Sequence, residues 1–235
     1  MKIKQIAQLL LEENVNNFIL RTKKKKVRKF PKGYNGLNLG CGYTNPKNWI
    51  GIDGSFLRFV TGTLPSSVIS KFIYENKLRN QLEEKQLIIH HNLNYGIPFQ
   101  DNCVPNIYSA HFIEHILKEQ VSSLLLEAFR VMKPDGYIRI CVPSLKANIE
   151  HIKQSIKKAE KGDTEDIQLY LTNRVDKYVH PNHYHKWTYY EDELVEMLNA
   201  AGFNNVKSYN RHEGNIPDIK ILDHRDGIFV EGQKK

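Results

Sequence analysis

The sequence predicts one α/β domain built on a mainly parallel sheet with helices on both faces. Short apolar segments alternate along the chain with amphipathic helical patterns, and repeated strand, helix, strand units form parallel sheets that helices cover. The 235 residues, of which 40% are hydrophobic, supply a substantial core for one domain but are too few for two comfortable domains. We therefore expect one domain with added segments.

The first 33 residues are expected to precede the main domain, which spans 34–235. Ile3, Ile6 and Leu10 repeat at helical spacing, so a helix here packs across the domain or forms a lid over a ligand pocket. A basic connector follows, formed by Lys23, Lys24, Lys25 and Lys26. Together with the net charge of +8, this run indicates either a solvated segment or contact with anionic membrane or nucleic acid.

Cysteine usage and hydropathy indicate a soluble protein in a reducing, cytoplasmic setting. Cys41, Cys103 and Cys141 lie far apart, without the pairing of a disulfide framework or a structural zinc site. Glu12 and Glu13 interrupt the one apolar patch near the N-terminus, and no later stretch approaches the length of a membrane span. The sequence does not indicate the oligomeric state.

The first two strands carry the clearest signs of a ligand site. Leu37–Leu39 ends in Gly40-Cys41-Gly42, where glycine lets the backbone turn tightly and bring its N–H groups against a ligand. The second strand, 48–54, ends in Asp53 and Gly54. A carboxylate there accepts hydrogen bonds from both ribose hydroxyls in nucleotide-binding α/β folds, or else serves as a turn residue before Gly54.

The third and fourth strands add polar residues at the same sheet edge. After an expected helical insertion at about 55–86, the third strand, 87–93, carries Asn92 and Leu93 at its end. The side-chain oxygen of Asn92 accepts a hydrogen bond from an adenine amino group, or Asn92 serves as a turn residue after the strand, and both interpretations stay open. The fourth strand, Ile107–His111, leads into a helix start that contains Glu114 and His115.

The rest of the chain continues the α/β pattern. A helix with its apolar repeat over 121–132 stops at Gly136, and a fifth strand over 137–143 follows. A second insertion at about 144–186 is helical and then crowded with aromatic and histidine residues. After another helix, two strands at 203–209 and 228–232 are expected to close the sheet as a hairpin.

These parts, in this order, resemble a class I S-adenosylmethionine-dependent methyltransferase. More narrowly, the chain is similar to the methyltransferase type 11 group and to predicted methyltransferases associated with surface-polysaccharide biosynthesis. The segments that carry the resemblance are Leu39-Gly40-Cys41-Gly42, Ile52-Asp53, Ile97-Pro98-Phe99 with Asp101, 107–115, 130–136, His185-Lys186-Trp187, Ala201-Gly202-Phe203 and Phe229-Val230-Glu231-Gly232.

The resemblance implies a Rossmann-like sheet of seven strands with the last strand antiparallel. It also implies S-adenosylmethionine lying across the carboxyl ends of the first and fourth strands. The implied cofactor-binding residues are Asn38, Gly40, Cys41, Gly42, Asp53, Gly54, Asn92, Leu93 and His111. Asn38 and Asn92 depart from the pattern, because many members carry a carboxylate at each position, and these departures put the affinity in doubt.

Methyl transfer from a sulfonium requires an aligned and desolvated nucleophile, and a base helps when that nucleophile is a hydroxyl. The catalytic candidates are His111, Glu114, His115 and His185; alternatively, Glu114 and His115 only brace the helix start. We expect no metal site, because no carboxylate has ligand spacing to the histidines at 180–185. The aromatic insertion is expected to cap an acceptor pocket with Tyr178, His183, Tyr184 and Trp187.

The sequence thus favours methyl transfer to a hydroxyl of a small molecule or saccharide. A nucleic-acid methyltransferase or nucleic-acid-binding module is an alternative because of the basic run, although the acidic-Pro-Pro-aromatic loop typical of base amino-group methylation is missing. A non-catalytic, methyltransferase-like partner subunit is a further alternative. A nicotinamide oxidoreductase is the remaining rival at the level of the fold, but the fuller G-x-G-x-x-G fingerprint is not present.

Overall fold

The computed structural model describes residues 14–22, 27–42, 44–55, 86–172 and 184–235. The first expected insertion, the basic run at Lys23–Lys26, and the candidate pocket residues Tyr178 and His183 therefore lie outside the described residues. Among the residues that are described, no helix is both long enough and apolar enough to cross a membrane.

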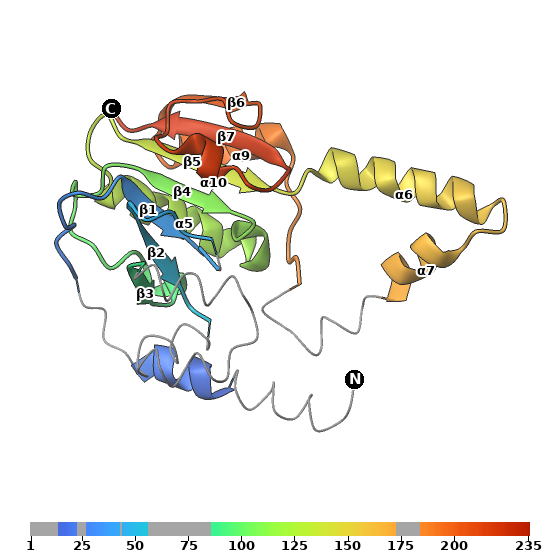
Figure 1. The fold of residues 1–235 in the computed structure, drawn as a ribbon, viewed down its shortest axis with the longest axis horizontal. Helices are drawn as coiled ribbons and strands as arrows, with labels where there is room; N and C mark the ends of the chain where they lie inside the picture. The colour runs from blue at the N-terminus through green and yellow to red at the C-terminus, as the bar shows by residue number, and fades with distance from the viewer. Residues whose placement is uncertain (1–13, 23–26, 43, 56–85, 173–183) are drawn as a thin grey trace.

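Seven strands form one sheet in the order β3-β2-β1-β4-β5-β7-β6. β7 runs antiparallel to both of its neighbours, and the other six strands are parallel to one another (Figure 1). This arrangement confirms the predicted Rossmann-like fold with its last strand antiparallel. The strands are β1 Gly36–Leu39, β2 Trp49–Asp53, β3 Ile88–His90, β4 Ile107–Ala110, β5 Tyr137–Val142, β6 Asn204–Tyr209 and β7 Ile228–Gln233.

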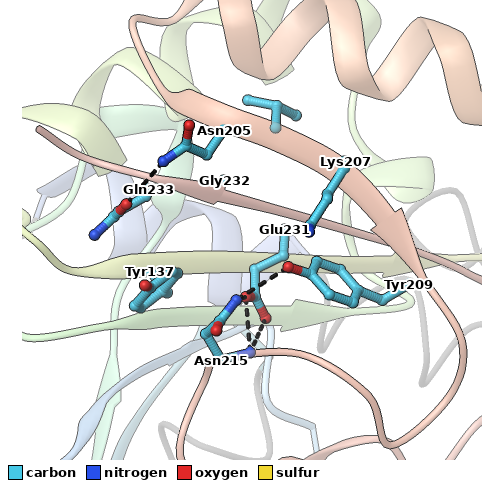
Figure 2. Close-up of a pocket in the computed structure, with 9 residues that line it drawn as sticks. Tyr137, Asn205, Lys207, Tyr209, Asn215, Glu231, Gly232 and Gln233 are labelled. Carbon is cyan, nitrogen blue, oxygen red and sulfur yellow. Dashed lines mark hydrogen bonds between the residues drawn. The ribbon is translucent and has the colours of Figure 1, made fainter.

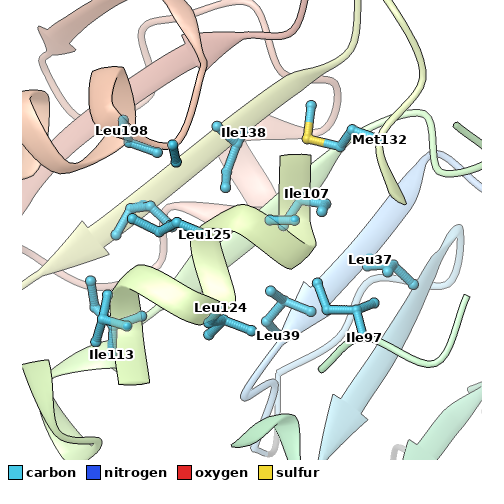
Figure 3. Packing of buried hydrophobic residues seen from close by; sticks show 14 of the residues in the cluster. Leu37, Leu39, Ile97, Ile107, Ile113, Leu124, Leu125, Met132, Ile138 and Leu198 are labelled. Atoms are coloured by element: carbon cyan, nitrogen blue, oxygen red, sulfur yellow. The ribbon is translucent and has the colours of Figure 1, made fainter. Parts of the chain in front are cut away.

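The main hydrophobic core lies between one face of the sheet and two helices, α5 (Lys118–Val131) and α9 (Glu191–Ala200). Apolar side chains recur at three and four residue intervals along α5, so one side of the helix is apolar and packs on the strands. Figure 3 shows these side chains meeting those of β1, β4 and β5. The cluster includes Leu37, Leu39, Ile107, Leu124, Leu125, Ile138 and Leu198, all of which are buried.

A smaller cluster covers the opposite face of the sheet. Trp49 and Tyr108 pack there against Ile216 and Leu222, and the short helix α10 (Ile219–Leu222) belongs to this layer. The expected closing hairpin is therefore more elaborate: β6 and β7 do pair as antiparallel strands, but the link between them crosses the sheet face and contains α10. Helices cover both faces as predicted.

A buried ion pair fixes this crossing link to the sheet. Arg139 of β5 donates two hydrogen bonds to Asp223, from Nε at 3.1 Å and from Nη2 at 2.7 Å. Both side chains are fully buried. Asp223 also accepts the backbone N–H of His212, so the two ends of the link are held at one point. Breaking such a pair by removing one partner leaves an uncompensated charge in the core.

The second insertion projects from the sheet as a helical hairpin made of α6 (Leu145–Ala159) and α7 (Glu165–Thr172) (Figure 1). Ser144 begins α6 as its N-cap and also forms an isolated bridge with Tyr189, just beyond the insertion. The N–H of Leu145 donates to the carbonyl of Tyr189 at 3.2 Å. The insertion therefore leaves the domain and returns to it at adjacent points.

The helix at residues 14–22 docks beside the carboxyl ends of β2 and β3. Asn16 donates to the carbonyl of Gly54 at 2.7 Å, and its side-chain oxygen lies 3.0 Å from Nε2 of His90. Leu20 of the same helix is buried. The structure thus places this N-terminal helix at the edge where the ligand site was predicted, a position that the sequence did not specify.

Gly40 offers a test of how tightly the sheet edge is packed. Its φ is +64°, and a Cβ there would lie 2.2 Å from Cγ of Phe112. We expect Gly40→Ala to lower the free energy of unfolding by about 3 kcal/mol, combining left-handed strain with overpacking. Gly33→Ala is the matched control, because Gly33 has a φ of +88° but no neighbour in the described part of the chain within 4 Å of the position that a Cβ would take.

The control variant should lose only about 1 kcal/mol, the cost of the left-handed backbone alone. Chemical denaturation of both variants beside the parent chain measures the two losses. Equal losses would show that the ring of Phe112 moves aside and that the close approach at Gly40 is not a constraint.

Candidate active site

The carboxyl ends of β1, β2 and β4 lie side by side because β1 is the central strand of the three. Leu39 pairs with Ile52 on one side and with Ser109 on the other. The loops that follow these three strands therefore begin at one edge of the sheet. In open α/β folds, ligands bind in the crevice outside the carboxyl ends of the strands, at a point of this kind. The edge brings together the predicted glycine turn, Asp53 and His111.

The glycine turn uses its N–H groups within the protein, which differs from the prediction that they face a ligand. The N–H groups of Gly40 and Cys41 donate to the carbonyl of Ile52, at 2.8 Å and 3.3 Å. The N–H of Gly42 donates to Oδ2 of Asp53 at 2.9 Å. Backbone amides need partners when they are buried, and the end of β2 supplies them here. The loop is thus fastened to β2 rather than opened toward a ligand.

Gly42 nevertheless leaves room for a ligand. Its φ is +48°, and no atom of the described residues lies within 4 Å of the position that a Cβ would take. By contrast, the side chain of Cys41 is buried, and its Sγ fills the space beside Gly51. Of the residues in the turn, Gly42 is therefore the one whose open side can lie against a cofactor.

Asp53 has one of the two roles that the sequence left open, that of a turn residue, and its position is compatible with the other. Its Oδ2 accepts the N–H of Gly42, and its Oδ1 accepts the N–H of Ser55 at 2.8 Å, so it acts as a turn residue. Each carboxylate oxygen has two acceptor sites, and one on each oxygen remains for a ribose hydroxyl. The half-buried carboxylate is therefore compatible with the predicted ribose contact, which stays a prediction.

Other residues predicted to bind the cofactor brace the site in this structure. Asn38 is buried, and its amide donates to the carbonyl of Thr44 at 2.7 Å. Asn92 caps a short 3-10 helix, Leu93–Tyr95, because its side-chain oxygen accepts a hydrogen bond from the N–H of Asn94 at 2.9 Å. It thus has the predicted role of a turn residue. Leu93 is buried, and the carbonyl of Gly54 accepts from the N-terminal helix. Contact of these residues with a cofactor stays a prediction.

The Asn38 bond explains why this chain does not need a carboxylate there. An amide can donate to the Thr44 carbonyl, whereas an aspartate would place two acceptors face to face in a buried site. We expect Asn38→Asp to lower the free energy of unfolding by about 2 kcal/mol. Asn204→Asp is the control, since Asn204 also donates to a carbonyl but is exposed; it should change stability by at most about 0.5 kcal/mol in thermal unfolding.

His111, Glu114 and His115 form a compact group after β4. His111 has a left-handed φ of +50°, a strained conformation for a histidine. Its Nδ1 lies 3.5 Å from Oε1 of Glu114, and Nε2 of His115 lies 4.0 Å from the same oxygen. Glu114 sits in a 3-10 turn, Ile113–His115, and its side chain is 1% exposed. Among the described residues, neither of its carboxylate oxygens has a hydrogen-bond partner.

The hydrogen bonds of the two histidines assign their neutral tautomers. Nε2 of His111 lies 3.0 Å from the carbonyl of Asp226, and Nδ1 of His115 lies 3.2 Å from the carbonyl of Tyr184. A carbonyl only accepts, so these nitrogens carry the hydrogen, and in each neutral ring the other nitrogen is an acceptor. Those acceptor nitrogens are the ones nearest to Glu114. Three acceptors thus converge on one buried point.

His185 joins this group from the far end of the second insertion. The N–H groups of Lys186 and Trp187 donate to the carbonyl of Glu114, at 2.7 Å and 3.3 Å. The rings of His115 and His185 meet edge to face with centroids 5.0 Å apart. One ligand atom from each of Glu114, His115 and His185 lies within 4.8 Å of the others. The carboxylate that the sequence lacked near the histidines therefore comes from the turn after β4.

Trp187 points away from this group. Its Nε1 donates to the carboxylate of Glu193 at 3.1 Å, and Nζ of Lys118 lies 4.6 Å from its ring centroid. The tryptophan is partly exposed on the surface formed by α5 and α9. Tyr184 is nearer to the group through its carbonyl bond to His115. Both described members of the predicted pocket, Tyr184 and Trp187, thus contact the catalytic candidates through backbone atoms, and the Trp187 ring packs elsewhere.

Burial sets the electrostatics of the group. It raises the pKa of Glu114 to about 7, a rise that its own backbone N–H and the positive charge of Arg225 oppose only in part. Burial also lowers the pKa of His111 and that of His185. Near neutral pH, the two histidines are therefore neutral and the glutamate is poised to gain or lose a proton.

The raised pKa of Glu114 predicts a pH-dependent stability. Because the folded protein holds this proton more tightly than the unfolded chain, the stabilisation is complete below pH 4.5 and is lost as the pH rises through about 7. The full effect is about 3 kcal/mol for a shift of this size. Denaturant unfolding from pH 4.5 to 8, with a chelator present, measures it.

Glu114→Gln should remove this pH dependence of the free energy of unfolding. Glu160→Gln, at an exposed position, should keep it. If the parent chain and Glu114→Gln had parallel pH profiles, the carboxyl would not be buried as described.

A pocket among the described residues lies away from the Glu114 group. It has a volume of about 410 Å³ and is formed by Tyr137 at the start of β5, the body of β6 and the end of β7 (Figure 2). Because β5 begins there, the pocket is at the amino-terminal end of the parallel strands, opposite the site edge. Its lining carboxylate, Glu231, is already bound by Asn215. None of the predicted site residues lines it.

Comparison with known proteins identifies part of the chain. Residues 37–140, less than half of the chain, match the family model for a methyltransferase domain. This segment runs from β1 into β5 and contains the glycine turn, Asp53 and the Glu114 group. The match supports the predicted methyltransferase and its cofactor, S-adenosylmethionine. A comparison with curated proteins found no match.

Several solved structures share features of the fold at low similarity. A SAM-dependent methyltransferase from Archaeoglobus fulgidus is 17% identical, with a TM-score of 0.48 over 96% of this chain and 93% of its own. Phosphoethanolamine N-methyltransferase 2 of Haemonchus contortus, in complex with S-adenosyl-L-methionine, is 13% identical, with a TM-score of 0.47 over 94% and 52%. A Burkholderia thailandensis 1,6-didemethyltoxoflavin-N1-methyltransferase is 14% identical, with a TM-score of 0.45 over 86% and 72%.

Proposed function

We propose that this protein is an S-adenosylmethionine-dependent methyltransferase that acts on a hydroxyl group of a small molecule or saccharide. The observation that carries the proposal is the meeting of three loops at the carboxyl ends of β1, β2 and β4. They bring together an open glycine, a carboxylate with unused acceptor sites, and a buried acid with neutral histidines. The methyltransferase domain match over 37–140 supports the same assignment.

In this proposal the adenosine lies across the end of β1. Its ribose hydroxyls donate to Asp53, and its chain passes the open side of Gly42 toward His111. These residues follow adjacent strands, so a molecule that spans β2 to β4 can reach all of them at once. The methyl group is then delivered beside the Glu114 group, on the β4 side of the site.

The Glu114 group would align the acceptor and take its proton. A hydroxyl becomes a better nucleophile as its proton is removed, and a base whose pKa is near the operating pH is the most effective. The carboxyl of Glu114 meets that condition because its pKa is about 7. His111 and His115 flank it and are more exposed, at 16% and 23%, so they stand between the buried acid and the acceptor.

The second insertion is proposed to select the acceptor. It ends in the segment that carries Tyr184 and His185 beside the Glu114 group, and aromatic side chains can stack on a sugar ring or an aromatic acceptor. A saccharide of surface-polysaccharide biosynthesis is the acceptor that the sequence resemblance suggests. We also propose that the basic run contacts anionic membrane and that the protein is cytoplasmic.

Binding of S-adenosylmethionine is the first test. Asp53→Asn keeps the shape of the side chain but removes its charge, and charge-assisted hydrogen bonds contribute about 1.5–3 kcal/mol. We expect the dissociation constant, measured by titration calorimetry, to rise roughly 10- to 100-fold. Asp166→Asn on the exposed end of the α6–α7 hairpin is the control and should bind as the parent chain does.

The same titration separates the rival functions. A parent chain that fails to bind S-adenosylmethionine would point to a non-catalytic relative. Binding without methyl transfer to any hydroxylated acceptor, together with salt-sensitive affinity for RNA or DNA, would favour a nucleic-acid substrate instead. An unchanged dissociation constant in Asp53→Asn would show that the ribose lies elsewhere.

A further inference from the structure

The side chains around Glu114 have the composition and placement of a cation site. Glu114 is 1% exposed, and neither of its oxygens has a hydrogen-bond partner among the described residues. An ionised carboxylate in such a place is costly unless a positive group lies against it. Arg225 lowers the pKa of Glu114 by its charge, but it is an exposed residue and makes no hydrogen bond to the carboxylate.

The neighbouring histidines add electron pairs rather than positive charge. The carbonyl bonds of His111 and His115 fix their hydrogens on the nitrogens that point away from Glu114. The nitrogens nearest to its Oε1, at 3.5 Å and 4.0 Å, are acceptors in the neutral rings. A carbonyl bond to the outer nitrogen is also the usual arrangement of a metal-binding histidine, because it fixes the tautomer.

His185 completes a set of three ligands. One ligand atom from each of Glu114, His115 and His185 lies within 4.8 Å of the other two. Ligand atoms of a tetrahedral zinc site with bonds of about 2.0–2.2 Å are roughly 3.4 Å apart, so the side chains need to close by about 1 Å. His185 is exposed, so its side chain can make this movement, and the three residues would leave a fourth position of the ion for an outside ligand.

We propose that Glu114, His115 and His185 bind a divalent transition-metal ion. Two imidazoles and one carboxylate suit Zn²⁺, Co²⁺ or Mn²⁺, because imidazole favours the later metals and carboxylate the harder ones. Three protein ligands with an open position are typical of catalytic rather than structural sites. The site joins the turn after β4 to the end of the second insertion, and the bonds from Lys186 and Trp187 to the Glu114 carbonyl hold the two together.

The ion has a role in the reaction if the proposed methyl transfer is correct, and this part rests on that function. An ion held by Glu114, His115 and His185 would act as a Lewis acid and would lower the pKa of the acceptor hydroxyl. With the ion bound, Glu114 would act as a ligand instead of the base, and the proton would pass to Nδ1 of His111, which lies 3.5 Å from Glu114. The oxygen then forms its bond to the methyl carbon as the carbon–sulfur bond breaks, and that electron pair stays on the sulfur of the product thioether.

A proton shared by Glu114 and His111 is the competing explanation of the same geometry. It would satisfy one carboxylate oxygen and would leave the other without a partner. Proton sharing would also leave His185 without a role in the group, although its ring makes an edge-to-face contact with the ring of His115. A metal titration distinguishes the two explanations, because only a metal site shows saturable binding of a metal ion.

The test uses the untagged full chain, stripped with a chelator and titrated with Co²⁺. We expect one Co²⁺ per chain, the visible absorption of four- or five-coordinate Co²⁺, and displacement by Zn²⁺. Glu114→Gln, His115→Ala and His185→Ala should each weaken binding at least tenfold. His151→Ala is the matched control, because His151 is exposed on α6 and outside the cluster, and it should bind as the parent chain does.

Circular dichroism confirms that each variant is folded. His185→Ala keeps the test decisive, because an exposed side chain can be removed without opening the core. No binding by the parent chain, or equal binding by the three variants, would overturn the proposal. S-adenosylmethionine titrations on the same samples separate the two hypotheses: cofactor binding without Co²⁺ binding rejects the metal site alone, and Co²⁺ binding without cofactor binding rejects the methyltransferase alone.

Discussion

The site depends on the position of β1 between β2 and β4. Leu39, the last residue of β1, is held in register by Ile52 and Ser109, so the spacing of the three following loops is set by backbone hydrogen bonds. All four residues of β1 are buried, and sheet pairing in such a strand does not slip, because a shift of one residue would turn its apolar side chains to the wrong face. The pairing of β2 and β4 with β1 therefore sets the distance between Asp53 and the Glu114 group, although the two do not touch.

The sequence predicted the sheet well where its signals are local. Apolar runs that end in glycine or a polar residue gave β1, β2, β4 and β5 with bounds close to those observed. β3 is shorter than expected, because Asn92 caps a 3-10 helix that begins at Leu93 and the backbone leaves the extended conformation there. α10 was missed altogether, since a helix of four residues inside a polar loop has no periodicity to detect.

The site was predictable in its parts and unpredictable in its assembly. His111, Glu114 and His115 lie in one short segment, so their proximity follows from the sequence. His185 reaches them through bonds from the N–H groups of Lys186 and Trp187, and a backbone group carries no signature of residue type. The glycine turn shows the same limit. The sequence predicted its tight backbone, but not the carbonyl and carboxylate of the neighbouring strand that accept its N–H groups.

The attachment of the second insertion has a consequence for how such a protein can diversify. Ser144 and Tyr189 pair where the insertion leaves and rejoins the domain, so whatever lies between them is a closed loop with its ends already joined. Lengthening a loop whose ends are fixed costs little free energy, since closure entropy grows only slowly with length. Evolution can therefore exchange or extend the α6–α7 hairpin while the sheet keeps its register. Under the proposed function, a new acceptor specificity would then require no change in the strands that are proposed to hold the donor.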